Sequence, residues 1–176
     1  MAALRGCYAR LRLRVNEDKS AVARVWDRKF LGYSMWVAKG QTVKLRVAAK
    51  AVNTFKATVR EITGRAAGRS LGQVAARLTA FLRGWKPYFA LADTPGIFDD
   101  LDKWIHRRLR ALQLKQWKRG PTIYRELKAR GVPKPLARAA AAHGRRWWAM
   151  ATHGALKTAM PTRSFDRLGI PRLAPH

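Results

Sequence analysis

A long run of apolar residues at helical spacing, between residues 71 and 89, most constrains how this chain folds. Apolar side chains recur there at positions i, i+3, i+4 and i+7 over about five turns, which places them on one face of a helix. Ser70 precedes the run and Gln73 follows three residues later, which is the pattern of a capping box. We therefore predict a helix that begins after Ser70, with a kink or a break at Pro87.

A second long helix is predicted from about residue 95 to residue 119. Thr94 and Pro95 suit an N-cap and a first helical position. Acidic residues follow in the opening turns and basic residues in the closing turns, as the helix dipole favours. Shorter helices are predicted over 50–63, between Gly120 and Gly131, over 136–142 and from Arg145 to about Met160. The tail from Pro161 is expected to be irregular or a short helix.

The segment before these helices is typical of strands. Residues 21–26 and 30–37 are rich in β-branched and aromatic residues and are separated by Asp27 and Arg28, which suit a turn. A short third strand is plausible over 42–47, and residues 1–14 look like the end of a helix. The fold class expected is mainly α, with a small antiparallel β-hairpin followed by a helical bundle.

The charge of the chain points to a polyanionic partner. Its 176 residues include 37 Lys and Arg against 10 Asp and Glu, a net charge of +27. Solubility needs far less charge than this, so nucleic acid is the favoured partner, ahead of an anionic membrane surface. No apolar run is long enough for a membrane span. The arginine-rich start resembles a mitochondrial transit peptide but lacks the usual serines, so targeting is the lesser reading.

The basic residues are concentrated in one part of the chain. Residues 103–146 contain fourteen Lys or Arg and one acid, Glu126. A solvated helix face normally mixes charges of both signs, so this bias favours a nucleic-acid surface, with Lys103, Arg107 and Arg110 on one exposed face. The residues predicted to bind RNA or DNA are Lys103, Arg107, Arg108, Arg110, Lys115, Trp117, Lys118, Arg119, Arg125, Lys128, Arg145 and Arg146.

Tryptophans lie among these bases. Trp104 falls on the apolar stripe of its helix and is expected in the core. Trp147 and Trp148 must point in different directions, so one is expected in the core and the other at the surface. An exposed tryptophan beside an arginine can stack on an unpaired base, which contributes about 1–3 kcal/mol.

The sequence lacks a complete catalytic constellation. Glu17 and Asp18 are adjacent, so they point to opposite faces of an extended segment. Asp99, Asp100 and Asp102 are explained by helix capping and the dipole, and the four histidines fit no metal-ligand spacing. The single cysteine, Cys7, excludes a disulfide within the chain and a cysteine-clustered zinc site. We expect no metal site in this chain.

Several motifs resemble those of group II intron reverse transcriptases. Residues 13–20 (LRVNEDKS) and 29–33 (KFLGY) are similar to the final motifs of the palm. Residues 81–89 (FLRGWKPYF) resemble the aromatic core motif of the maturase-specific, or X, domain. Residues 101–110 and 115–118 are similar to later parts of that domain. The motifs stand in the order of the family and extend over nearly the whole chain.

The resemblance implies a division into two domains. Residues 1–38 would be the C-terminal end of the palm, and residues 39–176 the thumb and X domain, which in the family bind intron RNA and the template–primer duplex. Lys19 would lie near the incoming nucleotide, while Gly32 and Tyr33 would lie in the hairpin that supports the primer end. Simple hairpin packing is at least as strong an alternative for Phe30 and Leu31.

The chain departs from the family in lacking the fingers and the paired catalytic aspartates. It should therefore not polymerise DNA alone, and magnesium is expected only in the missing palm. The chain would be a fragment, the product of a truncated gene, or one piece of a split polymerase active with a separate fingers–palm chain. A structural basic protein of the ribosome is the third reading. The expected location is the bacterial cytoplasm, in a ribonucleoprotein, with mitochondria less favoured.

Overall fold

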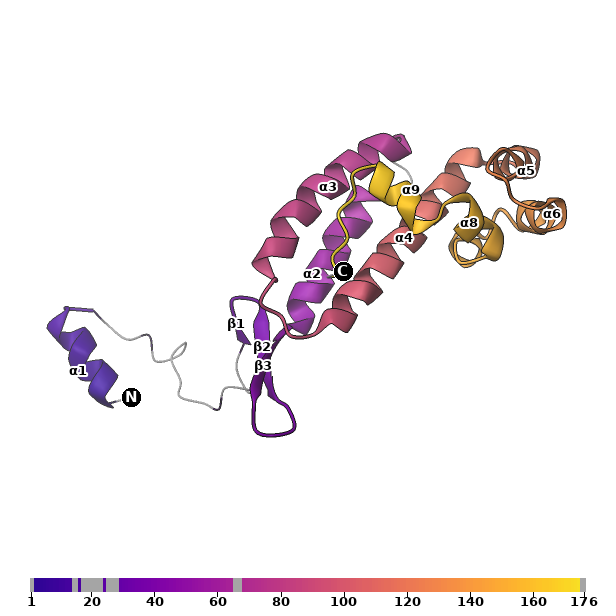
Figure 1. Ribbon diagram of the computed structural model, residues 1–176. Coiled ribbons are helices and arrows are strands. Elements are labelled where there is room, and N and C mark those ends of the chain that lie inside the picture. Colours follow the sequence, from indigo (N-terminus) through magenta and orange to yellow (C-terminus); the bar gives the residue numbers. More distant parts are fainter. Residues whose placement is uncertain (1, 14–15, 17–23, 25–28, 65–67, 175–176) are drawn as a thin grey trace.

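A small antiparallel sheet followed by a body of helices makes up the computed structural model (Figure 1). The structure describes residues 2–13, 16, 24, 29–64 and 68–174. The sheet lies at one end of three long helices, and the shorter C-terminal helices gather near the opposite end. The expected fold class, mainly α with a small antiparallel hairpin, is confirmed.

The sheet has three strands in the order β1-β2-β3, with β1 Lys29–Phe30, β2 Tyr33–Val37 and β3 Val43–Val47. The prediction of one strand over 30–37 is wrong, because Leu31 and Gly32 form a two-residue turn that pairs Phe30 with Tyr33. The two turn residues, Leu31 and Gly32, have positive φ, 49° and 78°, as a type I′ turn requires. The expected third strand pairs with β2 from Val37↔Val43 to Tyr33↔Val47.

The N-terminal segment agrees with expectation where it is described. Helix α1 covers Ala2–Arg10. The predicted strand over 21–26 lies outside the described residues except for Arg24. The expected boundary between residues 38 and 39 falls in the turn that joins the paired strands β2 and β3. The division into two domains stays a prediction.

Two amphipathic helices follow the sheet and pack against each other. Helix α2 covers Ala49–Ile62 and α3 covers Leu71–Tyr88. The capping box of α3 is confirmed, since the Ser70 hydroxyl accepts the N–H of Gln73 and the Gln73 side chain accepts the N–H of Ser70. Pro87 lies in the last turn of α3, so the predicted break is the end of the helix.

The longest helix, α4, covers Pro95–Trp117 and joins the two ends of the body. Pro95 stands at its start, as predicted, but the side chain of Thr94 makes no capping hydrogen bond. The hydroxyl oxygen of Thr94 is buried without a partner. The backbone of Thr94, with ψ at 76°, departs from the extended conformation that N-cap residues usually adopt, so the side-chain cap expected there is absent.

The C-terminal third is a series of short helices. They are α5 Gly120–Ala129, α6 Lys134–Ala142, α7 Trp147–Met150, α8 Gly154–Ala159 and α9 Thr162–Arg167. The single helix predicted from Arg145 to Met160 is wrong. His153 interrupts it, because its extended backbone and ring nitrogen cap the N-terminus of α8 by accepting the N–H of Ala155.

One hydrophobic core extends from the sheet to the C-terminal helices. Its fully buried side chains come from α2, α3, α4, α5, α8 and α9, and include Phe55, Leu78, Leu82, Leu109, Leu127, Leu156 and Phe165. No helix in the described ranges is both long and apolar enough to cross a membrane.

Candidate nucleic-acid interface

The residues predicted to bind nucleic acid are divided by the structure into three groups. Two are buried, Arg110 and Trp117. Four are half-buried, Arg107, Arg108, Lys115 and Lys128. Six are exposed, Lys103, Lys118, Arg119, Arg125, Arg145 and Arg146.

Arg110 is not on the exposed face that the sequence predicts, since only 8% of it is exposed. Its Nε donates to the carbonyl oxygen of Met160 at 3.0 Å, and its guanidinium lies over the ring of Phe165. Burial lowers the pKa of this guanidinium. Arg110 belongs to a buried polar stripe of α4 that also includes Asp102 and His106, at i, i+4 and i+8. The segment from Met160 to Ala174 covers this stripe.

Asp102 holds the C-terminal tail. Its carboxylate oxygens accept the N–H of Leu173, at 3.0 and 2.9 Å, and the N–H of Ala174, at 3.0 Å. Burial raises the pKa of Asp102, and these hydrogen bonds oppose that rise. The prediction that Asp102 serves the dipole of its own helix misses this role, because the partners lie 71 and 72 residues away.

Arg107 and Lys115 join α4 to α7. The Nε and Nη2 of Arg107 donate to the carbonyl oxygen of Trp148, at 3.1 and 3.0 Å, and the guanidinium stacks over the Trp148 ring at 4.0 Å. The ammonium of Lys115 lies 5.3 Å from the ring of Trp147. Trp147 is half-buried against the core and Trp148 is 38% exposed, which confirms the expected difference between them.

The remaining predicted aromatics also have packing roles. Trp104 is half-buried, and Lys56, Arg60 and Arg108 lie within 6.0 Å of its ring. Trp117 is 7% exposed and lies beneath the guanidinium of Arg130, 4.9 Å from its ring centre. Neither ring is free to stack on a base without moving a cation.

Four exposed cations surround a hollow at the end of α4. Lys118 and Arg119 connect α4 to α5, and Arg145 and Arg146 connect α6 to α7. We call this the basic hollow; it has a volume of about 540 Å³. Its lining residues are Lys118, Arg119, Gly120, Ile123, Ala141, Ala142, His143, Gly144, Arg145 and Arg146. No acid lies among them, so the basic hollow can bind an anion.

The backbone shapes the basic hollow as well. Helix α5 begins at Gly120 without a side-chain cap, so its positive dipole end is directed to this region. The C-terminal end of α6 also borders the hollow, but the N–H of Gly144 satisfies the carbonyl of Ala141. A Cβ at Gly144 would lie 2.3 Å from Cδ1 of the buried Ile123. Gly144 thus allows the arginine pair to approach α5.

Five of the seven described acids are engaged elsewhere, and the other two, Glu61 and Asp100, do not line the basic hollow. Asp99 pairs with Lys103 one turn away, Glu126 with Arg125 and Arg130, and Asp166 with Arg172. Hydrogen bonds to these partners raise the pKa of Lys103 and of Arg172 and lower that of Glu126. Asp93 accepts the N–H of Leu45 in the sheet. The cations of the basic hollow are therefore left for an external anion.

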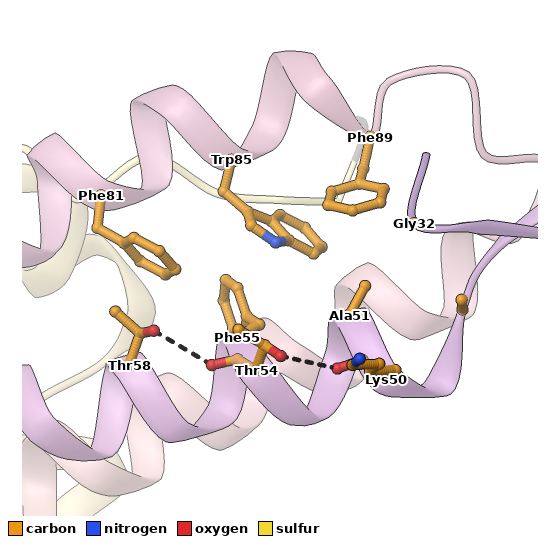
Figure 2. Close-up of a pocket in the computed structure, with 10 residues that line it drawn as sticks. Gly32, Lys50, Ala51, Thr54, Phe55, Thr58, Phe81, Trp85 and Phe89 are labelled. Carbon is orange, nitrogen blue, oxygen red and sulfur yellow. Dashed lines mark hydrogen bonds between the residues drawn. The ribbon is translucent and has the colours of Figure 1, made fainter. Parts of the chain in front are cut away.

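A second cavity, of different chemistry, lies between α2 and α3 (Figure 2). We call it the aromatic hollow; its volume is about 430 Å³, and the rings of Phe55, Phe81, Trp85 and Phe89 line it. Its polar residues come from α2: Lys50, Thr54 and Thr58. Both threonine hydroxyls donate to carbonyl oxygens one turn back in α2. The aromatic motif of residues 81–89 is thus used largely to pack α3 against α2.

A comparison with family models shows what part of this body of helices is similar to. Residues 52–131 match the model of the group II intron, maturase-specific domain. This part of the chain is similar to a maturase-specific domain, and the matched stretch is given that name below. No curated protein matches the sequence. The match supports a role in intron splicing, and it confirms the resemblance of residues 81–89, 101–110 and 115–118 to the maturase-specific domain.

The maturase-specific domain begins in α2, includes α3 and α4, and ends just after α5. It therefore contains the aromatic hollow's helices and one side of the basic hollow, Lys118 and Arg119. Arg145 and Arg146, on the other side, lie beyond the match. The described residues include no group of three or more His, Cys, Asp or Glu that could hold a metal ion.

The residues resembling the palm connect the sheet to the maturase-specific domain. A Cβ at Gly32 would lie 3.1 Å from the Phe89 ring, and the Tyr33 hydroxyl donates to the carbonyl of Tyr88 at 2.6 Å. Phe30 and Leu31 are 65% and 63% exposed, so hairpin packing does not account for them. Lys19 lies outside the described residues. The nucleotide- and primer-proximal roles stay predictions.

Proposed function

We propose that the chain binds group II intron RNA through the basic hollow and thereby assists folding and splicing of the intron. The observation that carries this proposal is the set of four exposed cations around the basic hollow, with no acid in its lining. Guanidinium and ammonium groups suit phosphate oxygens, which dominate RNA affinity. The maturase-specific domain supports the choice of intron RNA as the partner.

Lys103, Arg125 and Lys128 stay within the proposed interface as peripheral cations. Lys103 and Arg125 pair with acids on the surface, and such pairs contribute little and exchange readily for a phosphate. Arg107, Arg108 and Lys115 would act through their aromatic partners instead, by holding α7 and the α2–α3 connection in place. Arg110 and Trp117 are left out of the interface because they are buried.

We further propose that the chain works as the thumb and maturase part of a longer or split reverse transcriptase, in a bacterial ribonucleoprotein. Residues 1–38 would then continue a palm supplied with its own magnesium site, and the template–primer duplex would be a second ligand. The exposed Phe30 and Leu31 support this, because they sit beside the connection to the maturase-specific domain and lack cover among the described residues.

Removal of the basic hollow's charge should weaken RNA binding more than equal removal elsewhere. We expect Lys118, Arg119, Arg145 and Arg146, changed together to Gln, to lower affinity for a folded group II intron transcript by more than tenfold. The slope of the logarithm of the binding constant against the logarithm of the salt concentration should become less negative by about 3, since each lost phosphate contact contributes roughly 0.7–0.9 to it. Fluorescence anisotropy titrations between 50 and 300 mM salt would measure both.

A matched control removes four exposed cations elsewhere: Arg77, Arg83, Lys157 and Arg163, each changed to Gln. This variant should keep most of the affinity. Equal losses in the two variants would mean that net charge alone binds RNA, against the proposed interface. Equal affinity of the native chain for a scrambled transcript of the same length would contradict the link to intron RNA.

A further inference from the structure

Lys118 occupies a strained point of the backbone between α4 and α5. Its φ is 59° and its ψ −62°, and the N–H of Arg119 donates to the carbonyl of Trp117 at 2.7 Å. These values describe a γ-turn with positive φ at its centre, which is rare and strained. Glycine would adopt this turn more easily. The presence of lysine rather than glycine at this strained position suggests that the lysine side chain has a function.

Lys118 also lies between two hollows. One is the basic hollow, and the other, of about 370 Å³, is formed where the α2–α3 connection meets the end of α4. We call the latter the upstream hollow. Its cations are Arg69, Lys115 and Lys118, and no acid lines it. Lys118 is therefore flanked by cations in both directions.

The chemistry of both hollows suits phosphate rather than bases. Their linings contain ammonium and guanidinium groups, and the imidazole of His143 is the one aromatic ring among the described lining residues. The nearby tryptophans are occupied, Trp117 by Arg130 and Trp147 by Lys115. A strand held here would be bound by its backbone, without reading of its sequence.

We propose that the two hollows form one track for successive phosphates of a single RNA strand, with Lys118 contacting the strand where it passes between them. This inference rests on the proposed RNA-binding function and adds the path of the strand and the kind of contact. The two-residue connection from Trp117 to Gly120 is what allows one side chain to serve both hollows.

Three substitutions at Lys118 separate charge from strain. Lys118→Gly should raise Tm by about 3 °C, because the turn loses its strain, while affinity for a labelled eight-nucleotide oligouridylate falls about fivefold. The slope of the logarithm of the binding constant against the logarithm of the salt concentration should become less negative by about 0.7. Lys118→Ala should lose the same affinity without the gain in Tm, and Lys118→Arg should keep affinity within about twofold of native.

Single changes on either side test the path. Arg69→Gln and Arg145→Gln should each lower affinity for the octamer, whereas Lys157→Ala, an exposed lysine on α8, should leave it unchanged. If only one of the two arginine variants loses affinity, the strand occupies one hollow and the track is wrong. A Lys118→Gly variant with native affinity and salt dependence would overturn the role of Lys118.

These outcomes are distinct from failure of the proposed function. A native chain that binds neither the octamer nor the intron transcript would contradict RNA binding itself. A chain that binds the transcript while Lys118→Gly has no effect would contradict only the track. The Lys118 variants can also be tested on anionic lipid vesicles. If they lose binding to the vesicles but retain binding to RNA, the hollows belong to a membrane-binding surface and the inference is overturned.

Discussion

Asp102→Ala should destabilise the chain by about 3 kcal/mol, because it leaves the buried N–H groups of Leu173 and Ala174 without an acceptor. Leu173 is itself 3% exposed, so its release also uncovers apolar surface of the core. Asp102→Asn should cost less, since the amide keeps one acceptor oxygen. Urea denaturation followed by circular dichroism measures these changes in the free energy of unfolding.

Asp100→Ala is the matched control for this prediction. Asp100 lies two residues earlier on the same helix and is exposed, so its removal should change stability by no more than about 0.5 kcal/mol. Equal effects of the two substitutions would show that the helix dipole, rather than the tail, explains Asp102. In a chain that ends at residue 172, the cost of Asp102→Ala should shrink, because its partners are gone.

The second large effect expected is a loss of stability on acidification, caused by His106. The pKa of His106 is lowered from 6.5 to about 4, mainly by burial and then by the charge of Arg110; Asp166 opposes the shift and Arg172 adds a smaller lowering. The ring is 9% exposed and stacks on Phe165 at 4.7 Å. The folded chain thus keeps His106 neutral at pH values where the unfolded chain protonates it.

The direction of the pH effect follows from this lowered pKa. The stability contributed by neutral His106 is fully present above pH 6.5 and is lost as pH falls toward 4, because the unfolded state then binds the extra proton. Between pH 7 and pH 5 we expect the free energy of unfolding to decrease by about 2 kcal/mol. His106→Gln should remove most of this decrease, measured by urea denaturation at both pH values.

His143→Gln serves as the comparison, since His143 is exposed at the end of α6. It should leave the dependence on pH unchanged. A native chain whose stability is constant from pH 7 to pH 5 would mean that His106 is protonated without cost in the folded state. That result would contradict the burial of the polar stripe of α4.

Local signals in the sequence predicted the helices well. The capping box at Ser70 and the spacing from Leu71 to Phe89 determine α3 through contacts a few residues apart, and such patterns can be read directly. The glycine and proline positions also marked the ends of α4 and α5 within about two residues. The break at His153 was missed because a histidine is an unusual N-cap and gives no clear signal.

Long-range contacts account for what the sequence did not predict. Asp102, His106 and Arg110 form a polar row with helical spacing, which is the normal pattern of a solvent-facing side. The C-terminal segment covers this row and supplies its partners, and nothing local indicates that cover. The arginine pair at residues 145–146 was predicted to bind RNA, but its meeting with Lys118 and Arg119 depends on how α6 returns beside α5.

The length of helix α4 sets the distance between the two ends of the helical body. It runs without interruption from Pro95, near the sheet, to Trp117, beside the basic hollow, and its 23 residues extend about 34 Å. A rigid helix of this kind holds the hairpin of β1 and β2 and the basic hollow at a fixed separation. Any RNA that touches both ends must present its two contact points at that separation. If the proposed interface binds RNA, the chain would select among RNA folds by their dimensions as well as by their phosphates.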